Sequence, residues 1–155
     1  MIRVFAKLVV WLSLLSSLSG TLARADSADD TRALNRQVVG LVTAHRFDEA
    51  KPLAEQALKL CANTGNVRVY CESQFLELLG DIARGQGKIP EALASYQKAE
   101  QVREAGLNPN DYAIGMGQLH LGVFFNELHR DADEEVALKR ATNILGQIPQ
   151  AAENY

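Results

Sequence analysis

The chain of 155 residues carries 16 basic and 19 acidic side chains, which gives a formal net charge of −3 at pH 7. An acidic chain without a cluster of lysine or arginine binds nucleic acids and anionic membranes poorly, so neither is expected as a partner. No histidine lies near the two cysteines, which argues against a structural zinc site.

The N-terminal segment has the features of a secretory signal peptide over residues 1–25. Arg3 and Lys7 precede the apolar stretch 8–23, and small residues on either side of Arg24 permit cleavage after Ala25. The alternative is an uncleaved membrane anchor, but this stretch is shorter and more polar than the roughly 20 residues of a spanning helix. We therefore expect a secreted protein, located in a bacterial periplasm, without a membrane attachment after cleavage.

Removal of the signal would leave 130 residues, enough for one domain with a modest core. The remaining 13 basic and 19 acidic side chains give a net charge of −6. Residues 26–30 would form a linker to a folded domain over 31–150.

Three related segments follow one another at intervals of 42 residues. HRFDEAKPLAEQA begins at His45, GKIPEALASYQKA at Gly87 and HRDADEEVALKRA at His129. Such regular self-similarity indicates a stack of repeated units. The positions that keep their character are an alanine (Ala57, Ala99, Ala141), a basic residue (Arg46, Lys88, Arg130) and an acidic residue (Glu49, Glu91, Asp133).

Each repeat reads as two helices joined by a short turn. In the middle copy, apolar residues at helical spacing run up to a turn at Gly85 and Gly87, and a second apolar stripe follows Pro90. In the first copy, Asp48 is expected to cap the second helix, which places Pro52 in its opening turn. The three repeats keep an alanine on one helix, and two of them keep a glycine, Gly80 or Gly122, on the facing helix. These small residues predict close contact between paired helices. The apolar stripes of the middle copy consist of Phe75, Leu79, Ile82 and Ala83, then Ala92, Tyr96, Ala99 and Val102.

The middle copy resembles the tetratricopeptide repeat family. The resemblance implies an all-α fold, an α-solenoid of three helix-turn-helix units over about 31–64, 66–107 and 111–148. The usual unit of that family has about 34 residues, so longer helices or longer connectors, such as 61–71 and 104–111, must absorb the difference. The matching residues are Leu79-Gly80, Ala83, Gly87-Lys88, Glu91-Ala92, Tyr96 and Ala99, with Leu41, Arg46–Ala50, Ala57, Leu121-Gly122, Phe125 and Ala141 in the flanking copies.

The third unit departs from this pattern. Glu134 takes the position of an alanine, and Asp131 takes that of an apolar residue, which predicts a looser turn. No further helix is expected to cover the last unit, so Ile144, Leu145 and Ile148 are predicted to be exposed and available for self-association or docking.

Cys61 and Cys71 are candidates for one disulfide. An exported chain meets an oxidising compartment, where such pairs tend to close. The alternative is two buried thiols.

No group of residues has the spacing of an enzyme active site, a metal site or a phosphate-binding loop, so neither catalysis nor a cofactor is expected. His45 and His129 fall at the turn position of Gly87, where a role at the end of a helix explains them. His120 lies on the first helix of its unit with Glu127 two turns further on, so it is either a ligand or pH-sensing group or a partly buried, hydrogen-bonded side chain. The acidic run 131–135 lacks the glycine and spacing of a calcium loop, and an acidic helix N-terminus explains it better.

The resemblance also implies a binding surface, because the first helices of successive units line the concave side of such a stack. We expect the protein to be an interaction module that binds another polypeptide there. A basic clamp for a C-terminal carboxylate is absent. The alternative is a structural subunit of an envelope complex that docks, or forms homo-oligomers, through the uncapped last helix. The predicted groove residues are Asn35, Val39, Val42, Glu77, Asp81, Arg84, His120, Val123, Asn126 and Glu127.

Overall fold

A computed structural model describes residues 28–147 of the chain. The predicted signal peptide over 1–25 and Ile148 lie outside the described residues. Within them, the secondary structure is entirely helical. The first helix covers 28–43. The elements that follow are α2 (Phe47–Cys61), the short 3-10 helix η1 (Gly65–Val67), α3 (Arg68–Gly85), α4 (Ile89–Gly106), α5 (Tyr112–Glu127) and α6 (Asp131–Leu145).

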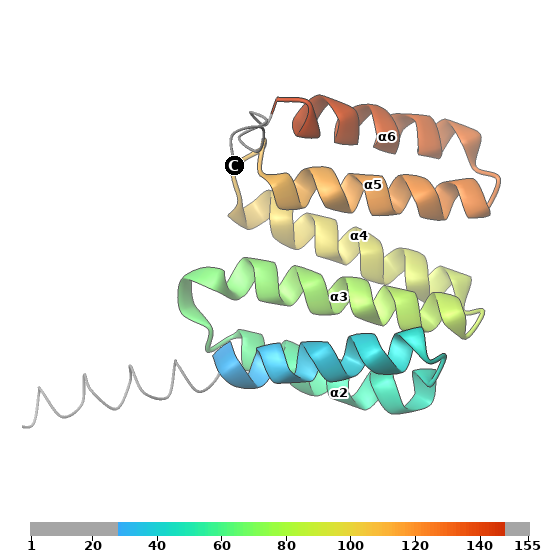
Figure 1. Ribbon diagram of the computed structural model, residues 1–155. Coiled ribbons are helices and arrows are strands. Elements are labelled where there is room, and N and C mark those ends of the chain that lie inside the picture. The colour runs from blue at the N-terminus through green and yellow to red at the C-terminus, as the bar shows by residue number, and fades with distance from the viewer. Residues whose placement is uncertain (1–27, 148–155) are drawn as a thin grey trace, which may run out of the picture.

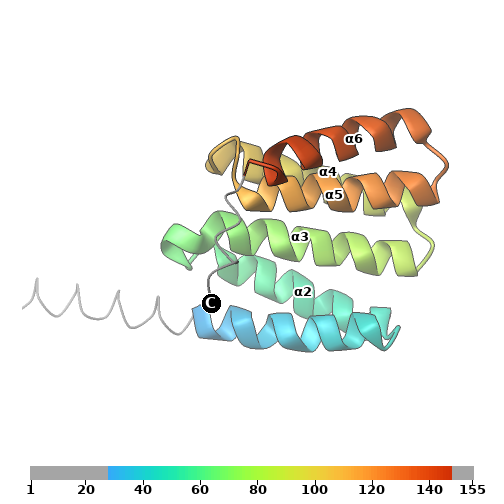
Figure 2. The same cartoon turned by 45° about the horizontal axis from the view of Figure 1, so that its top comes forward.

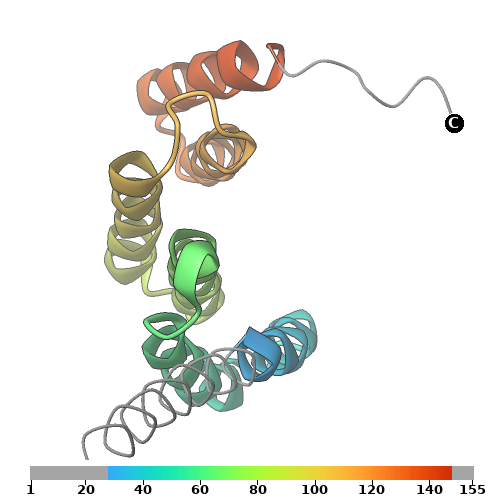
Figure 3. The same ribbon diagram turned by 90° about the vertical axis from the view of Figure 1, so that its left-hand side faces the viewer.

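These helices form three antiparallel hairpins that stack side by side (Figure 1). Figure 3 shows that the stack is curved. The helix over 28–43, α3 and α5 form its inner, concave layer, and α2, α4 and α6 form the outer layer, so the all-α stack of three helix-turn-helix units predicted from the repeats is confirmed.

The extra length of each repeat lies mainly in the helices. α3 and α4 each contain 18 residues. The expected connectors are shorter than predicted, because Arg68–Cys71 already belong to α3 and Glu104–Gly106 still belong to α4. Figure 2 shows the resulting long, parallel layers of helices.

Small residues let the paired helices approach closely, as the repeat pattern predicts. Ala57 and Ala99 are completely buried and Ala141 is 2% exposed. A Cβ atom added to Gly80 would lie 2.5 Å from the ring of Tyr96, and one added to Gly122 would be equally close to Leu138. No larger side chain fits at either glycine unless the facing side chain moves.

The core has two parts. The first joins the opening hairpin to α3, and the second joins α4 to the last hairpin, where the rings of Tyr96 and Phe124 meet edge to face with centroids 5.0 Å apart. The first cluster contains Val38, Ala50, Ala54, Ala57, Cys61, Phe75, Leu78 and Ile82, and the second contains Ala83, Ala92, Tyr96, Leu121, Phe124, Phe125 and Ala137.

The three turns have the same backbone structure. His45, Gly87 and His129 all adopt a positive φ, of 57°, 73° and 54°. The next residue donates its N–H back to the helix in each case, from Arg46 to Leu41, Lys88 to Ala83 and Arg130 to Phe125. The prediction of a looser third turn is therefore wrong. Glu134 is tolerated at the alanine position because its carboxylate accepts two hydrogen bonds from Asn126, at 3.0 and 3.1 Å.

Two expectations about the start of α2 are also wrong. The helix begins at Phe47, and the Asp48 carboxylate accepts a hydrogen bond of 2.7 Å from Gln86 at the end of α3, so it does not cap α2. Pro52 consequently lies beyond the opening turn, inside the helix. Arg46 directly precedes the helix and pairs with Glu49. Arg130 precedes α6 and pairs with Asp133 in the same way, which explains the recurring basic and acidic positions of these two repeats.

The last helix does not expose the residues predicted for docking. Ile144 is only 3% exposed, and Leu145 is partly buried, because both pack over Gly115 of α5. The stripe that was expected to need another helix is covered by the hairpin partner. Val136, which is 70% exposed, is the large apolar side chain that α6 presents to solvent.

Candidate functional site

All ten predicted groove residues lie on the inner layer, but the structure brings only half of them into one groove. A hollow of about 670 Å³ is lined by Val42, Asp81, Arg84, His120 and Val123. Sequence reasoning missed His45, Phe47, Gly85 and Tyr96, which complete the lining.

The other five predicted residues do not line this groove. Glu77 lies next to His120, with Oε1 3.6 Å from Nδ1, and Glu127 pairs with Arg84. Asn126 is bound to Glu134 of α6. Val39 is exposed and Asn35 is half-buried elsewhere on the first helix.

The groove crosses from the second hairpin to the third. Nη1 of Arg84 on α3 lies 3.5 Å from Oε1 of Glu127 on α5, and both side chains are partly accessible to water. The hydroxyl of Tyr96 donates a hydrogen bond of 2.7 Å to Oδ1 of Asp81. Burial, and then the Asp81 carboxylate, raise the pKa of Tyr96 far above its ordinary value, so this phenol remains a donor at any physiological pH.

A buried ionic cluster lies behind the groove, where α3, α4 and α5 meet. Nη2 of Arg103 is 2.7 Å from Oε2 of Glu77, and Nη1 of the same guanidinium bonds Glu100. Gln118 of α5 donates a further bond of 2.8 Å to Glu100. The side chains of Arg103 and Glu100 are 5% and 7% exposed. Gly117 leaves the space they need, since a Cβ atom there would overlap both groups.

The cluster changes the acid–base properties of its members. The nearby Glu77 carboxylate raises the pKa of His120 above its usual value, although burial acts the other way. Burial tends to raise the pKa of Glu77, but the nearby His120 and Arg103 side chains outweigh it and lower that pKa. Burial raises the pKa of Glu100 in spite of its bonds to Gln118 and Arg103. Protonated His120 is therefore favoured beside an ionised Glu77.

Sequence reasoning missed this cluster, although the repeat contains a signal for it. One period earlier, Glu100 corresponds to Leu58 and Arg103 corresponds to Cys61. Charged residues therefore occupy columns that are apolar or sulfur-containing in the first unit. A charge at a packed repeat position requires a partner, and the partners lie on α3 and α5.

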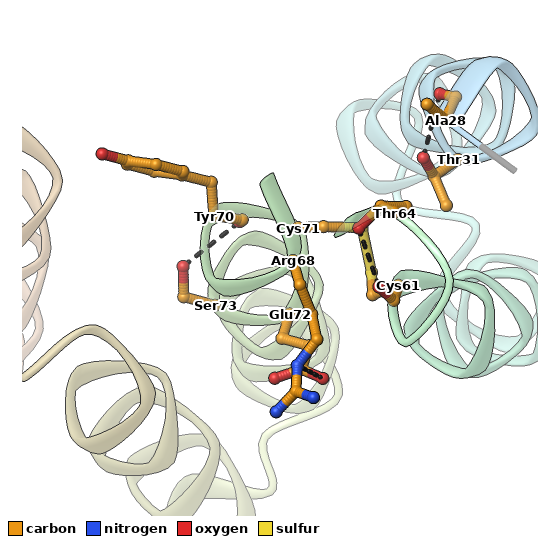
Figure 4. Close-up of a disulfide and its surroundings, with 9 residues drawn as sticks. All are labelled: Ala28, Thr31, Cys61, Thr64, Arg68, Tyr70, Cys71, Glu72 and Ser73. Carbon is orange, nitrogen blue, oxygen red and sulfur yellow. Dashed lines mark hydrogen bonds and ion pairs between the residues drawn. A yellow bond between two sulfur atoms is a disulfide. The ribbon is translucent and has the colours of Figure 1, made fainter. Parts of the chain in front are cut away.

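The corresponding junction between the first two hairpins is covalent. Cys61 at the end of α2 and Cys71 in the first turn of α3 form a disulfide, with Cα atoms 5.5 Å apart. Figure 4 shows this bond beside Thr64, whose hydroxyl donates to the carbonyl of Cys61 at 2.7 Å. Cys61 and Arg103 occupy the same position in successive repeats. The first junction of the stack is therefore joined by a disulfide and the second contains an ionic cluster.

Within 28–147, no three His, Cys, Asp or Glu side chains are grouped so that they could hold a metal ion. Among the helices described, none is both long and apolar enough to cross a membrane.

Comparison with known proteins adds no relative. The sequence matches no family model, and a search of curated proteins finds no match.

Proposed function

We propose that the protein is an exported interaction module of the tetratricopeptide-repeat type that binds a polypeptide segment in its concave groove. The observation that carries the proposal is the groove of about 670 Å³, which three inner-layer helices line with both apolar and charged side chains. A rigid stack loses little conformational entropy when a flexible segment docks, which favours binding. The recurring helical hairpins and the cysteine pair support the family and the oxidising compartment.

The test is affinity capture from an envelope extract with two charge-swapped variants of the chain. Asp81→Lys combined with Arg84→Glu changes the groove while keeping the net charge. Glu55→Lys combined with Lys98→Glu makes the same exchange on exposed positions of the outer layer. We expect a bound polypeptide to be lost from the groove variant alone, with unchanged helicity by circular dichroism. Equal capture by both variants would remove the groove from the proposal.

Export is tested separately. The mass of the protein recovered from the envelope should correspond to a chain that starts at Asp26, with two hydrogens fewer than the reduced form. A full-length mass would argue for a retained anchor.

A structural role through α6 is the second candidate, and Val136 is the observation that favours it. A valine with 70% of its surface exposed on an outer helix is a candidate contact for another subunit. Val136→Asp should then dissociate a complex while leaving the hairpin intact. Leu145 is unsuitable for this test because it packs on Gly115.

A further inference from the structure

Acidic side chains outnumber basic side chains around the groove. In the groove and the buried cluster behind it, carboxylates outnumber guanidinium groups by four to two. With His120 neutral, this leaves an excess of two negative charges at a site that is partly removed from water. The carboxylates are those of Glu77, Asp81, Glu100 and Glu127, and the guanidinium groups are those of Arg84 and Arg103.

His120 partly offsets this excess at the edge of the groove. Its side chain is 53% exposed, and its Nδ1 lies 3.6 Å from Oε1 of Glu77. Facing it are Glu77 and Asp81 from α3 and Arg103 from α4, with Arg84 in the same lining. A proton on the imidazole reduces the negative excess by one, and a cation from a bound partner would have the same effect.

The groove also has an apolar side. Val42 of the first helix and Val123 of α5 line it, and Val123 is 48% exposed. An exposed valine beside carboxylates that lack a counter-charge favours a ligand with one apolar and one basic side chain.

We propose that the groove selects a polypeptide segment with a lysine or arginine beside an apolar side chain. The cation lies at Asp81, beside the pair of His120 and Glu77, where it offsets the negative excess as the His120 proton does. The apolar side chain packs on Val42 and Val123. This inference rests on the proposed binding function and names the chemistry of its partner.

The competition between the two positive charges makes binding depend on pH. As the pH falls through the pKa of His120, the imidazole gains a proton and the attraction for a second cation decreases. Because Glu77 raises that pKa, the decrease begins above the ordinary histidine value of about 6.5. Affinity for a basic segment should therefore fall on acidification.

The experiment uses the full chain and a random peptide library displayed on phage, selected at about pH 8. Enriched sequences are synthesised without histidine, so that the peptide itself does not titrate, and binding is followed by fluorescence anisotropy. We expect enrichment of lysine or arginine next to an apolar residue, and a loss of about tenfold in affinity when that cation becomes glutamine. Asp81→Asn should cause a similar loss, and the matched outer-layer change Glu55→Gln should cause none.

The pH profile gives a second readout that does not depend on how well Asp81→Asn folds. Affinity should decrease severalfold between about pH 8 and pH 6 for the unchanged chain, and His120→Gln should flatten this profile. Enrichment of acidic or uncharged peptides, with affinity indifferent to Asp81→Asn, would overturn the inference while the binding function stands. A selection that gives the same peptides on the Asp81→Lys, Arg84→Glu variant, or no peptides at all, would overturn both.

Discussion

Gly117 shows how a single missing side chain permits a buried ionic cluster. Gly117→Ala would place a methyl group on Glu100 and Arg103, so one of their hydrogen bonds must break. We expect the free energy of unfolding to fall by about 1–3 kcal/mol, measured by urea titration. Gly40→Ala is the matched control, because nothing lies within 4 Å of the added atom and alanine favours the helix. Equal effects of both changes would mean that the space at Gly117 is not needed.

The turn residues with a positive φ allow a second test on single residues. His129 has a φ of 54°, which costs a non-glycine residue about 1 kcal/mol, so His129→Gly should stabilise the protein by roughly 0.5–1 kcal/mol. Gly87→Ala should have the opposite sign, and only through backbone conformation, because the space around Gly87 is open. Thermal unfolding of both variants would check the pair. A loss of stability in His129→Gly would point to a contact of the imidazole instead.

His120 should titrate above an ordinary histidine in the free protein. Its pKa in the folded state is raised by Glu77, so its contribution to stability is fully present below about pH 6.5 and is lost as the pH rises through the folded pKa. NMR titration of the imidazole should show this, and Glu77→Gln should move the pKa back down. A value at or below 6.5 in the unchanged chain would contradict the pairing.

At the scale of the elements, the contact of α3, α4 and α5 depends on one guanidinium. Arg103→Leu would leave Glu100 buried without a counter-ion and Glu77 with His120 alone, and we expect a loss of about 3–5 kcal/mol in urea unfolding. Replacing all three by apolar residues, as Glu77→Leu, Glu100→Leu and Arg103→Met, should recover most of that loss. If the single and triple variants are equally unstable, packing rather than charge explains the effect.

The pairing of helices could be predicted from sequence because it depends on periodicity and residue size. Ala57, Ala99 and Ala141 identified the close contacts, and the 42-residue interval identified three hairpins. The cluster around Arg103 could not be predicted in the same way, because a charged residue in a helix is ordinarily assigned to the solvent. The prediction for Ile144 is wrong for a related reason: the sequence pattern shows an apolar stripe on α6, but not that α5 covers it.

At the scale of the whole molecule, a reductant should loosen the first junction of the stack and leave the second junction unchanged. Hairpins in a stack contact only their neighbours, so loosening one junction is felt mainly beside it. Reduction of Cys61–Cys71 removes a constraint of roughly 2–3 kcal/mol. Hydrogen exchange should therefore accelerate in residues 28–61 and change little in α5 and α6. Equal acceleration along the described chain would show that the stack opens as one cooperative unit.

The curvature of the stack depends on the same junctions. The groove runs from the first helix across α3 to α5, so the angles between neighbouring hairpins at both junctions set its width. At the second junction the angle is held by the Arg84–Glu127 ion pair and the hydrogen bond from Gln118 to Glu100, whereas the first junction is held by a covalent bond. A partner that replaces one of those ionic contacts would therefore bind at the adjustable side of the groove.

The disulfide also affects the outcome of proteolysis. The loop between Cys61 and Cys71 contains Arg68, where a trypsin-like enzyme could cut. A single cut inside this loop separates the first hairpin from the rest of the backbone, yet the two fragments stay joined through sulfur. Such a nicked molecule would migrate as one species until it was reduced, and its groove, built from both fragments, would remain assembled.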